Sequence, residues 1–372
     1  MTKATNSLVM KKRNQKMILD LIRSEEVSRA QIAAKTGLTK AAVTLLIEEL
    51  IKLGLITESE SDYCGVGRKP ILLKLVSDRF YAVGVNITRK HCSFGIIDLA
   101  GNILKEENFC IKGLSPNEVT EKIVFDLNKI IKALKIKKTN LLGVGISTPG
   151  PIDYKTNTIL SPPNFEKWHG FNLNILGERL ALPIRTENIA NAFAISEKYF
   201  GSQKTNDNFI TVLVDEGIGS GIITEDKIHR GGNGLGNELG HISIDFSGRP
   251  CSCGNIGCLE RYASIPALLS GTSFSSWKEV IDQNCESIIE KEVKYLSSAL
   301  ISVINLFDLK TVVLGGDLTY NGKLFAEKLY EKLKDRNITK SKLSVLPSSL
   351  ENKVVIAGTL MIDRFFKGDD YN

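Results

Sequence analysis

One histidine and three cysteines stand close together in the second half of the chain, at spacings that suit a metal ion. His241 is followed by Cys251, Cys253 and Cys258, with glycines between the last two cysteines. Three thiolates and one imidazole suit tetrahedral Zn²⁺, and a set without a spare position is typical of a structural site. Cysteines scattered through a core would not have this spacing. The sequence therefore predicts a structural zinc site in the loop 241–258.

Two carboxylates border this loop. Glu238 precedes the histidine, and Glu260 follows the last cysteine. A zinc ion that holds the loop would also hold both side chains in place. We therefore expect the metal to shape a ligand pocket without taking part in chemistry.

The basic charge of the chain is concentrated near its start. Residues 1–70 hold 12 Lys and Arg against 8 Asp and Glu, which is +4 of the total net charge of +6. A basic segment on a nearly neutral body indicates a polyanionic partner at one end, although a solvated basic face would have the same composition. No apolar run is long enough to span a bilayer, and the polar start lacks the apolar core of an export signal. We therefore expect a cytoplasmic protein with no membrane partner.

The same segment has the pattern of a helix-turn-helix. Apolar residues recur at helical spacing in 14–24. Ser28 and Gln31 form a capping box that begins a second helix, and Gly37 breaks that helix. A third helix, 40–53, opens with small and polar residues, which a recognition helix must present to the major groove. A small interaction domain that does not bind DNA is the alternative.

A two-stranded wing is expected next, from residues 55–57 and 71–75. Its glycine-flanked tip carries an arginine and a lysine, which could reach a minor groove or phosphates. Helix pattern, wing and local charge agree on DNA binding. The predicted DNA contacts are Arg29, Lys40, Thr44, Arg68 and Lys69.

The rest of the chain has the pattern of two similar halves. Each half alternates strands with a long helix, which predicts an α/β protein with two lobes. A small ligand belongs in the cleft between such lobes. The expected elements are strands 80–87, 91–98 and 103–109, helix 116–134 and strand 141–147 in the first half, and strands 209–214 and 219–224, helix 287–307 and strand 311–314 in the second.

Two stretches around the cysteines resemble the signature of the ROK family of repressors, open reading frames and sugar kinases. They are 236–241 and 251–260. The helix-turn-helix, the wing sequence 67–70 and the stretch 187–191 are similar to the repressor branch of this family. Further stretches similar to the xylose-operon repressors of that branch are 11–16, 244–246 and 346–350.

The resemblance implies a fold and a set of ligand contacts. The fold is a winged helix-turn-helix, 1–76, followed by a two-lobed actin/hexokinase-like (ribonuclease H-like) sugar-binding body, 77–372. Carboxylates, amides and an imidazole in the cleft would satisfy a sugar and reject analogues that leave a group unpaired. The histidine would use one ring nitrogen for zinc and the other for a hydroxyl. The implied sugar-binding residues are Asn164, Asn188, Glu238, His241 and Glu260.

Two departures from the family's kinases indicate that this chain is not an enzyme. In the stretch 84–88, Asn86 stands where the kinases have an acid, and β-branched residues replace glycines that admit phosphates. Ile189 stands where the kinases have the aspartate that deprotonates the sugar, and isoleucine cannot accept a proton. Glycine turns at 217–221 and 315–316 remain, which we interpret as retained backbone geometry. We therefore expect no catalytic residue.

These features together predict a sugar-responsive transcriptional repressor. A homodimer or a dimer of dimers would bind operator DNA through paired recognition helices, and a small sugar, xylose or a similar one, would release it. Other interpretations stay open at this point. They are a sugar kinase with a DNA-binding appendage, a regulator that responds to another sugar, a phosphosugar or a protein partner, and a structural dimer with constitutive repression.

Overall fold

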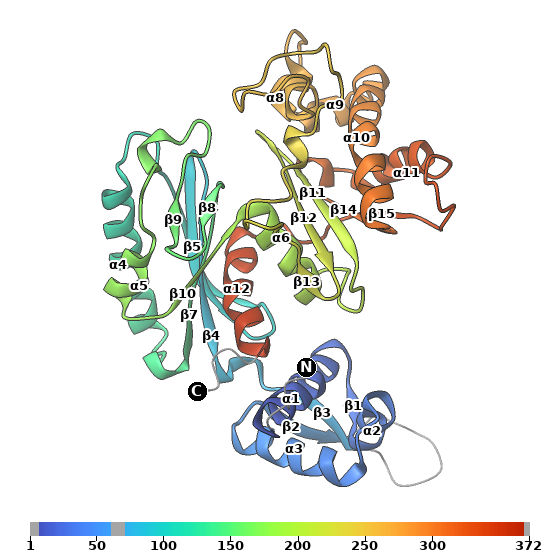
Figure 1. Ribbon diagram of the computed structural model, residues 1–372. Coiled ribbons are helices and arrows are strands. Elements are labelled where there is room, and N and C mark those ends of the chain that lie inside the picture. Colours follow the sequence, from blue (N-terminus) through green and yellow to red (C-terminus); the bar gives the residue numbers. More distant parts are fainter. Residues whose placement is uncertain (1–6, 61–70, 368–372) are drawn as a thin grey trace.

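The computed structural model describes residues 7–60 and 71–367, which form a winged domain (7–75) below two α/β lobes that stand side by side (Figure 1). This is the expected fold class. None of the helices in the described ranges is long and apolar enough to cross a bilayer. The short 3₁₀ turns are Ser77–Arg79, Lys138–Asn140, Glu166–Trp168, Leu239–His241 and Asp317–Thr319.

The winged domain forms as its capping pattern predicts. The side chain of Ser28 accepts a hydrogen bond from the backbone N–H of Gln31, and the Gln31 side chain accepts one from the backbone N–H of Ser28. Gly37 ends the second helix at φ 71°, in the left-handed region that favours glycine. The wing sheet gains a strand that the sequence pattern did not show, because Val27–Ser28 pairs with the last wing strand. The elements are α1 (Ser7–Ser24), β1 (Val27–Ser28), α2 (Arg29–Thr36), α3 (Lys40–Lys52), β2 (Ile56–Glu60) and β3 (Ile71–Leu75).

Lobe I is a mixed sheet in the order β10-β7-β4-β5-β6, with β10, β7 and β4 parallel. Helices α4 and α5 cover one face and α12 covers the other (Figure 1). Glycines let α12 pack directly on the strands. A Cβ on Gly84 would lie 2.1 Å from the carbonyl oxygen of Val354, and one on Gly145 would lie 2.0 Å from that of Ala357. The elements are β4 (Tyr81–Ile87), β5 (His91–Asp98), β6 (Ile103–Cys110), α4 (Pro116–Ala133), β7 (Leu141–Thr148), β8 (Ile152–Asp153), β9 (Thr158–Ile159), α5 (Asn174–Leu180), β10 (Ile184–Asn188) and α12 (Lys353–Lys367).

Lobe II repeats this plan with the order β13-β12-β11-β14-β15, in which β11, β14 and β15 are parallel. Helix α6 covers the face toward lobe I, and α10 and α11 cover the other face (Figure 1). The apolar periodicity predicted the inner strands and the long helices α4 and α10, but not α12 or the edge strands β10, β13 and β15. The elements are α6 (Ile189–Tyr199), β11 (Phe209–Val214), β12 (Ile218–Thr224), β13 (Lys227–Ile228), α7 (Glu260–Ala263), α8 (Ile265–Leu269), α9 (Trp277–Asp282), α10 (Glu286–Phe307), β14 (Thr311–Gly316), α11 (Gly322–Leu333) and β15 (Ser344–Pro347).

Helices α6 and α12 fill the junction between the lobes. α6 packs on β12 of lobe II and on α12 of lobe I, and α1 of the winged domain packs on α12. A continuous apolar cluster runs through this junction and includes Ile18 and Ile22 of α1, Phe193 of α6 and Phe366 of α12. The winged domain is therefore packed against the body at the place where the two lobes meet.

Candidate functional site

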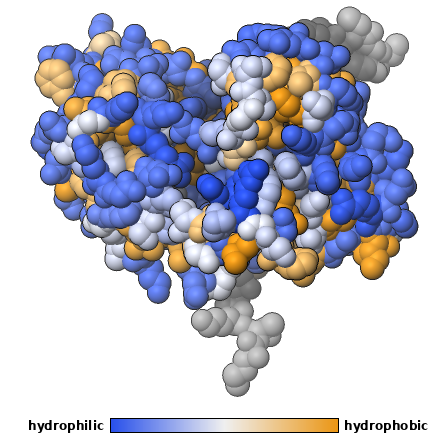
Figure 2. Space-filling model, turned by 90° about the horizontal axis from the view of Figure 1, so that it is seen from above, coloured by the Kyte–Doolittle hydropathy of each residue, from blue (hydrophilic) through white to orange (hydrophobic). Residues whose placement is uncertain are grey.

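A cavity of about 760 Å³ lies between the two lobes. Its walls come from the ends of β4 and β10 in lobe I and from the β11–β12 turn and α7 in lobe II. Figure 2 views the molecule from above and shows hydrophilic side chains over most of this face, with a hollow between its two halves. Open α/β sheets bind ligands outside the carboxyl ends of their parallel strands, and the volume is in the usual range of small-molecule sites.

Most of the predicted sugar-binding residues line this cavity. Asn164 does not: its side chain is exposed, and only the neighbouring Pro163 reaches the cavity wall. The cleft therefore brings together carboxylate, amide and imidazole groups of the kinds expected, from both lobes. The lining residues of the predicted set are Asn188, Glu238, His241 and Glu260.

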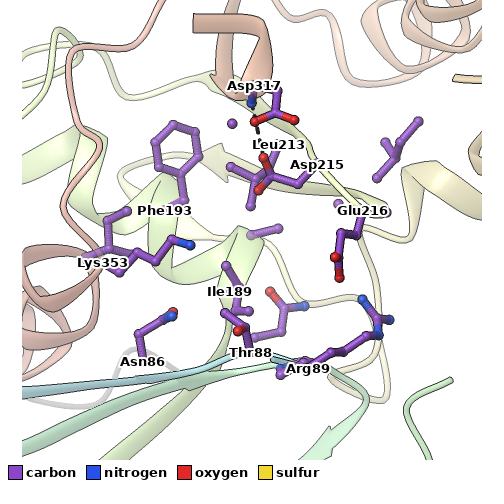
Figure 3. A pocket seen from close by; sticks show the side chains of 18 of the residues that line it. Asn86, Thr88, Arg89, Ile189, Phe193, Leu213, Asp215, Glu216, Asp317 and Lys353 are labelled. Atoms are coloured by element: carbon purple, nitrogen blue, oxygen red, sulfur yellow. Dashed lines mark hydrogen bonds between the residues drawn. The ribbon is translucent and has the colours of Figure 1, made fainter. Parts of the chain in front are cut away.

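The start of α6 places an amide and an alkyl side chain at the cavity wall. Asn188 caps the helix, and its Oδ1 accepts a hydrogen bond from the backbone N–H of Asn191 at 2.7 Å. The Nδ2 group of Asn188 is thereby left as the donor for a ligand. Ile189 lines the cavity beside it (Figure 3). A branched alkyl group cannot deprotonate a hydroxyl, so position 189 offers no general base.

The two carboxylates of the site have different surroundings. The Oε2 atom of Glu260 accepts a hydrogen bond from the backbone N–H of Ile218 at 2.9 Å. Gly217 permits this approach, because a Cβ there would lie 2.6 Å from the same oxygen. Glu238 is reached by solvent through the open cleft, yet desolvation by the cleft walls raises its pKa, with His241 opposing the shift and Glu260 adding to it.

A buried polar network behind the site joins the lobes, and the sequence pattern did not predict it. Glu187 is fully buried, and its Oε2 accepts hydrogen bonds from Arg230 Nη2 at 2.5 Å and Nε at 3.1 Å. Its Oε1 accepts one from Asn191, whose own Oδ1 accepts one from Asn237. Asn237 adjoins Glu238, so the network ties the start of α6 to the opposite wall of the cleft. The stretch 187–191 was noted in the sequence because it resembles the repressor branch of the family. Nothing in the sequence pattern identified its partners from lobe II, Arg230 and Asn237.

The predicted metal ligands come together as expected. The ligand atoms of His241, Cys251, Cys253 and Cys258 all lie within 4.8 Å of one another. The Sγ atom of Cys251 is 3.7 Å from Nδ1 of His241, and the Sγ atoms of Cys253 and Cys258 are 3.7 Å apart. Ligands about 2.3 Å from a tetrahedral ion lie roughly 3.7 Å from one another. These residues therefore fit a structural Zn²⁺.

Carboxylates and basic side chains share the other half of the cavity, where Lys90 pairs with Glu216 and Lys353 lies near Asp215. Asp215 and Glu216 follow β11, and Asp317 follows β14. The Oδ1 atom of Asp215 accepts a hydrogen bond from the backbone N–H of Asp317 at 3.1 Å (Figure 3). Burial raises the pKa of Asp215 to about 6, the charge of Asp317 adds to this shift, and Lys353 opposes it. The glycine turns thus adjoin carboxylates, and Lys353 offsets part of their charge.

Three of the predicted DNA contacts lie on helices α2 and α3. Lys40 is exposed in the first turn of α3, and the hydroxyl of Thr44 donates to its carbonyl oxygen at 2.9 Å. Arg29 begins α2 and forms an ion pair with a glutamate of β2. The wing-tip residues Arg68 and Lys69 lie outside the described residues. The N-terminus of α3 is open to solvent, as a recognition helix requires.

Helix α1 docks on the body at the far end of α6. Arg23 donates a hydrogen bond to the carbonyl oxygen of Tyr199 at 2.7 Å, and its guanidinium lies 4.4 Å from the centre of the Tyr199 ring. The Arg23 side chain is only 8% exposed. Lys16 forms an ion pair at 3.6 Å with Asp226, in the turn between β12 and β13. The winged domain therefore contacts both α6 and lobe II.

Known proteins share this architecture over most of the chain. A model of the ROK family matches residues 82–364. The chain is 30% identical to a xylose repressor from Caldicellulosiruptor bescii, covering 95% of this chain and 96% of that protein. It is 31% identical to a xylose repressor from Bacillus subtilis, covering 96% of each.

Solved structures extend the likeness to the fold. A ROK family transcriptional regulator, a homologue of the E. coli MLC protein, has a TM-score of 0.77 at 23% identity and covers 96% of this chain and 97% of its own. A ROK hexokinase from Thermus thermophilus has a TM-score of 0.65 at 24% identity, covering 76% of this chain and 97% of its own. The family fold thus occurs in regulators and in kinases. The chain belongs to the ROK family, among its transcriptional regulators.

Proposed function

We propose that this ROK regulator is a repressor that a sugar releases from operator DNA, with D-xylose as the first candidate inducer. Relatives that match nearly the whole chain are named xylose repressors. The cleft offers a cavity of suitable size with hydrogen-bonding groups on both walls. The winged domain supplies an exposed N-terminus of α3 for the major groove.

One observation carries the proposal: a single helix joins the cavity to the winged domain. α6 begins with Ile189 at the cavity wall and ends at Tyr199, which Arg23 of α1 contacts. Its 11 residues span about 16 Å, at 1.5 Å per residue. A sugar that closes the cleft and moves α6 therefore moves the docking site of α1 directly.

The response requires the sugar to bind the DNA-incompetent arrangement more tightly than the DNA-competent one. Couplings of this kind are usually about 1–3 kcal/mol, or about 5–150-fold in affinity. The ion pair between the buried Glu187 and Arg230 joins the lobes behind the cleft. Zn²⁺ would stabilise the loop that follows Glu238 and precedes Glu260, and it would not act on the sugar.

We infer that the active species is a homodimer. Two α3 helices, one per copy, would enter successive major grooves of a palindromic operator about 34 Å apart. The absence of a base at Ile189 argues against sugar phosphorylation. An assay of ATP turnover with the same sugars tests that alternative directly, and turnover would favour the kinase.

The main test is operator binding, measured by fluorescence anisotropy on a duplex selected from random sequences. D-xylose and a panel of other pentoses and hexoses are added at saturating concentration. At least one sugar is expected to weaken operator binding about fivefold or more. Glu238→Gln is expected to lose this response, whereas Glu178→Gln, on the exposed face of α5, is the matched control. If no sugar changes the affinity of the wild-type protein, the proposal is wrong.

A further inference from the structure

A buried amide in lobe I faces the sugar cleft with an unused donor. Asn86 lies near the end of β4, lines the cavity and is 2% exposed. Its Oδ1 accepts a hydrogen bond from the hydroxyl of Ser147 at 2.8 Å. Its Nδ2 has no hydrogen-bond partner among the described residues. Native proteins rarely leave a buried donor unpaired, so this group calls for a partner from outside the chain.

Asn86 and Asn188 lie on the two strands that flank β7, one register position apart. In the parallel sheet, Asn86 pairs with Ser147 of β7, and Asn188 pairs with Thr148, the next residue of the same strand. Neighbouring strands lie about 4.8 Å apart, so the two asparagine backbones are roughly 10 Å apart at one sheet edge. Because the two residues are one register position apart, strand alternation directs their side chains to different faces of the sheet, and both line the cavity at this edge.

In both amides, the oxygen atom is already used in a hydrogen bond within the protein. The Oδ1 of Asn86 is engaged by Ser147, and the Oδ1 of Asn188 is engaged by the first turn of α6. Each amide therefore keeps N–H groups for a ligand. The wall formed by lobe II carries Glu238 and Glu260, whose carboxylates accept hydrogen bonds. A sugar hydroxyl can donate to one wall and accept from the other, which suits this division.

We propose that Asn86 is a sugar-binding residue whose Nδ2 donates a hydrogen bond to a hydroxyl oxygen of the inducer. That hydroxyl projects past Ile189 toward β4, into the space beneath Lys353 that the Asn86 amide faces (Figure 3). The inference rests on the proposed function, because it adds a contact to the same cleft. A ligand without this hydroxyl leaves the buried donor unpaired and is rejected.

Two substitutions test the role of the donor in the full-length protein. Asn86→Leu removes it at similar volume. Asn86→Asp keeps an oxygen for the hydroxyl of Ser147 and replaces the donor with an acceptor, so it tests the inference even if the leucine variant misfolds. Asn108→Leu, on the exposed strand β6, is the matched control. Circular dichroism and thermal unfolding report whether each variant is folded.

Calorimetric titration with D-xylose, D-glucose and their monodeoxy derivatives measures the effect. Both Asn86 variants are expected to bind the inducing sugar at least about tenfold more weakly at pH 8, which equals about 1.4 kcal/mol. For Asn86→Asp, the loss should shrink as the pH falls, because a protonated carboxyl donates a hydrogen bond again. One deoxy derivative should bind the wild type more weakly than its parent sugar does. The same derivative and its parent should bind Asn86→Leu with equal affinity.

The outcomes separate this inference from the function on which it rests. If the wild type binds a sugar and both Asn86 variants bind it equally well, the role of Asn86 is wrong and the proposed function stands. The role of Asn86 is also wrong, and the proposed function stands, if removing each hydroxyl from the sugar weakens binding to Asn86→Leu as much as it weakens binding to the wild type. If the wild type binds none of the sugars, the proposed function and this inference both fall.

Discussion

The contact between Arg23 and the end of α6 allows the proposed coupling between sugar binding and operator binding to be removed without a change in the cleft. Arg23→Met keeps a side chain of similar helix propensity in α1 but removes the hydrogen bond to the carbonyl oxygen of Tyr199 and the cation–π contact at 4.4 Å. A hydrogen bond from a charged donor contributes about 1.5–3 kcal/mol, and a cation–π contact contributes about 0.5–2 kcal/mol.

These contributions do not simply add, because one side chain makes both contacts. The buried Nε of Arg23 also has no hydrogen-bond partner among the described residues, and its desolvation offsets part of the stabilisation that the two contacts provide. We therefore expect Arg23→Met to weaken the docking of α1 by about 2–3 kcal/mol. A loss of this size is sufficient to remove a coupling of the usual 1–3 kcal/mol, since about 1.4 kcal/mol is a factor of ten.

The assay compares operator Kd values with and without saturating sugar by fluorescence anisotropy. For Arg23→Met, the operator Kd with sugar is expected to lie within about threefold of the Kd without sugar. The affinity of the free protein for the sugar should change little. Arg179→Met is the matched control, because Arg179 is exposed on α5 at the outer face of lobe I (Figure 1). A full sugar response in Arg23→Met would refute the idea that α6 carries the signal to α1.

Further predictions concern the metal, Asp215 and the lobe junction. Cys253→Ser is expected to lose bound zinc, measured by atomic absorption, and to unfold at lower temperature. Cys285→Ser is the control and should keep the metal. Equal zinc contents in the two variants would contradict the site. The pKa of Asp215, raised from 3.8 to about 6, makes the folded state bind more protons between these values, so the free energy of unfolding should fall by up to about 3 kcal/mol as the pH rises through this window. Asp215→Asn should remove that fall in urea unfolding from pH 4 to 8, and an unchanged slope would count against it. Arg230→Met leaves the buried Glu187 carboxylate without its ion pair and should cost about 3 kcal/mol of unfolding free energy; a double-mutant cycle with Glu187→Gln should show strong coupling, and additive effects would argue against the pair.

Local features of the fold could be predicted from the sequence because their partners are close along the chain. The capping box of Ser28 and Gln31 and the turn at Gly37 depend on hydrogen bonds and dihedral angles within a few residues. The cysteine loop is also local, since Cys251 and Cys258 are seven positions apart and glycines let the backbone turn between them. The inner strands and the long helices α4 and α10 were predicted for the same reason, whereas α12 was missed.

The edge strands and the polar network could not be predicted in this way. β10 and β15 are short, and each lies beside a neighbour that is distant in sequence. Glu187 and Arg230 are 43 positions apart, and either residue alone has the sequence appearance of a surface charge. Only the folded chain shows that one of them is fully buried.

The sequence itself determined the cluster of His241 and three cysteines, the alkyl side chain at Ile189 and the caps of the helix-turn-helix, because residue type and short spacing decide them. The tertiary structure alone decided that Arg23 meets Tyr199, 176 positions away, and that Asn86 faces the cleft with an unpaired donor. Those facts depend on how strands and helices pack across long loops, and nothing local encodes which distant surfaces will meet.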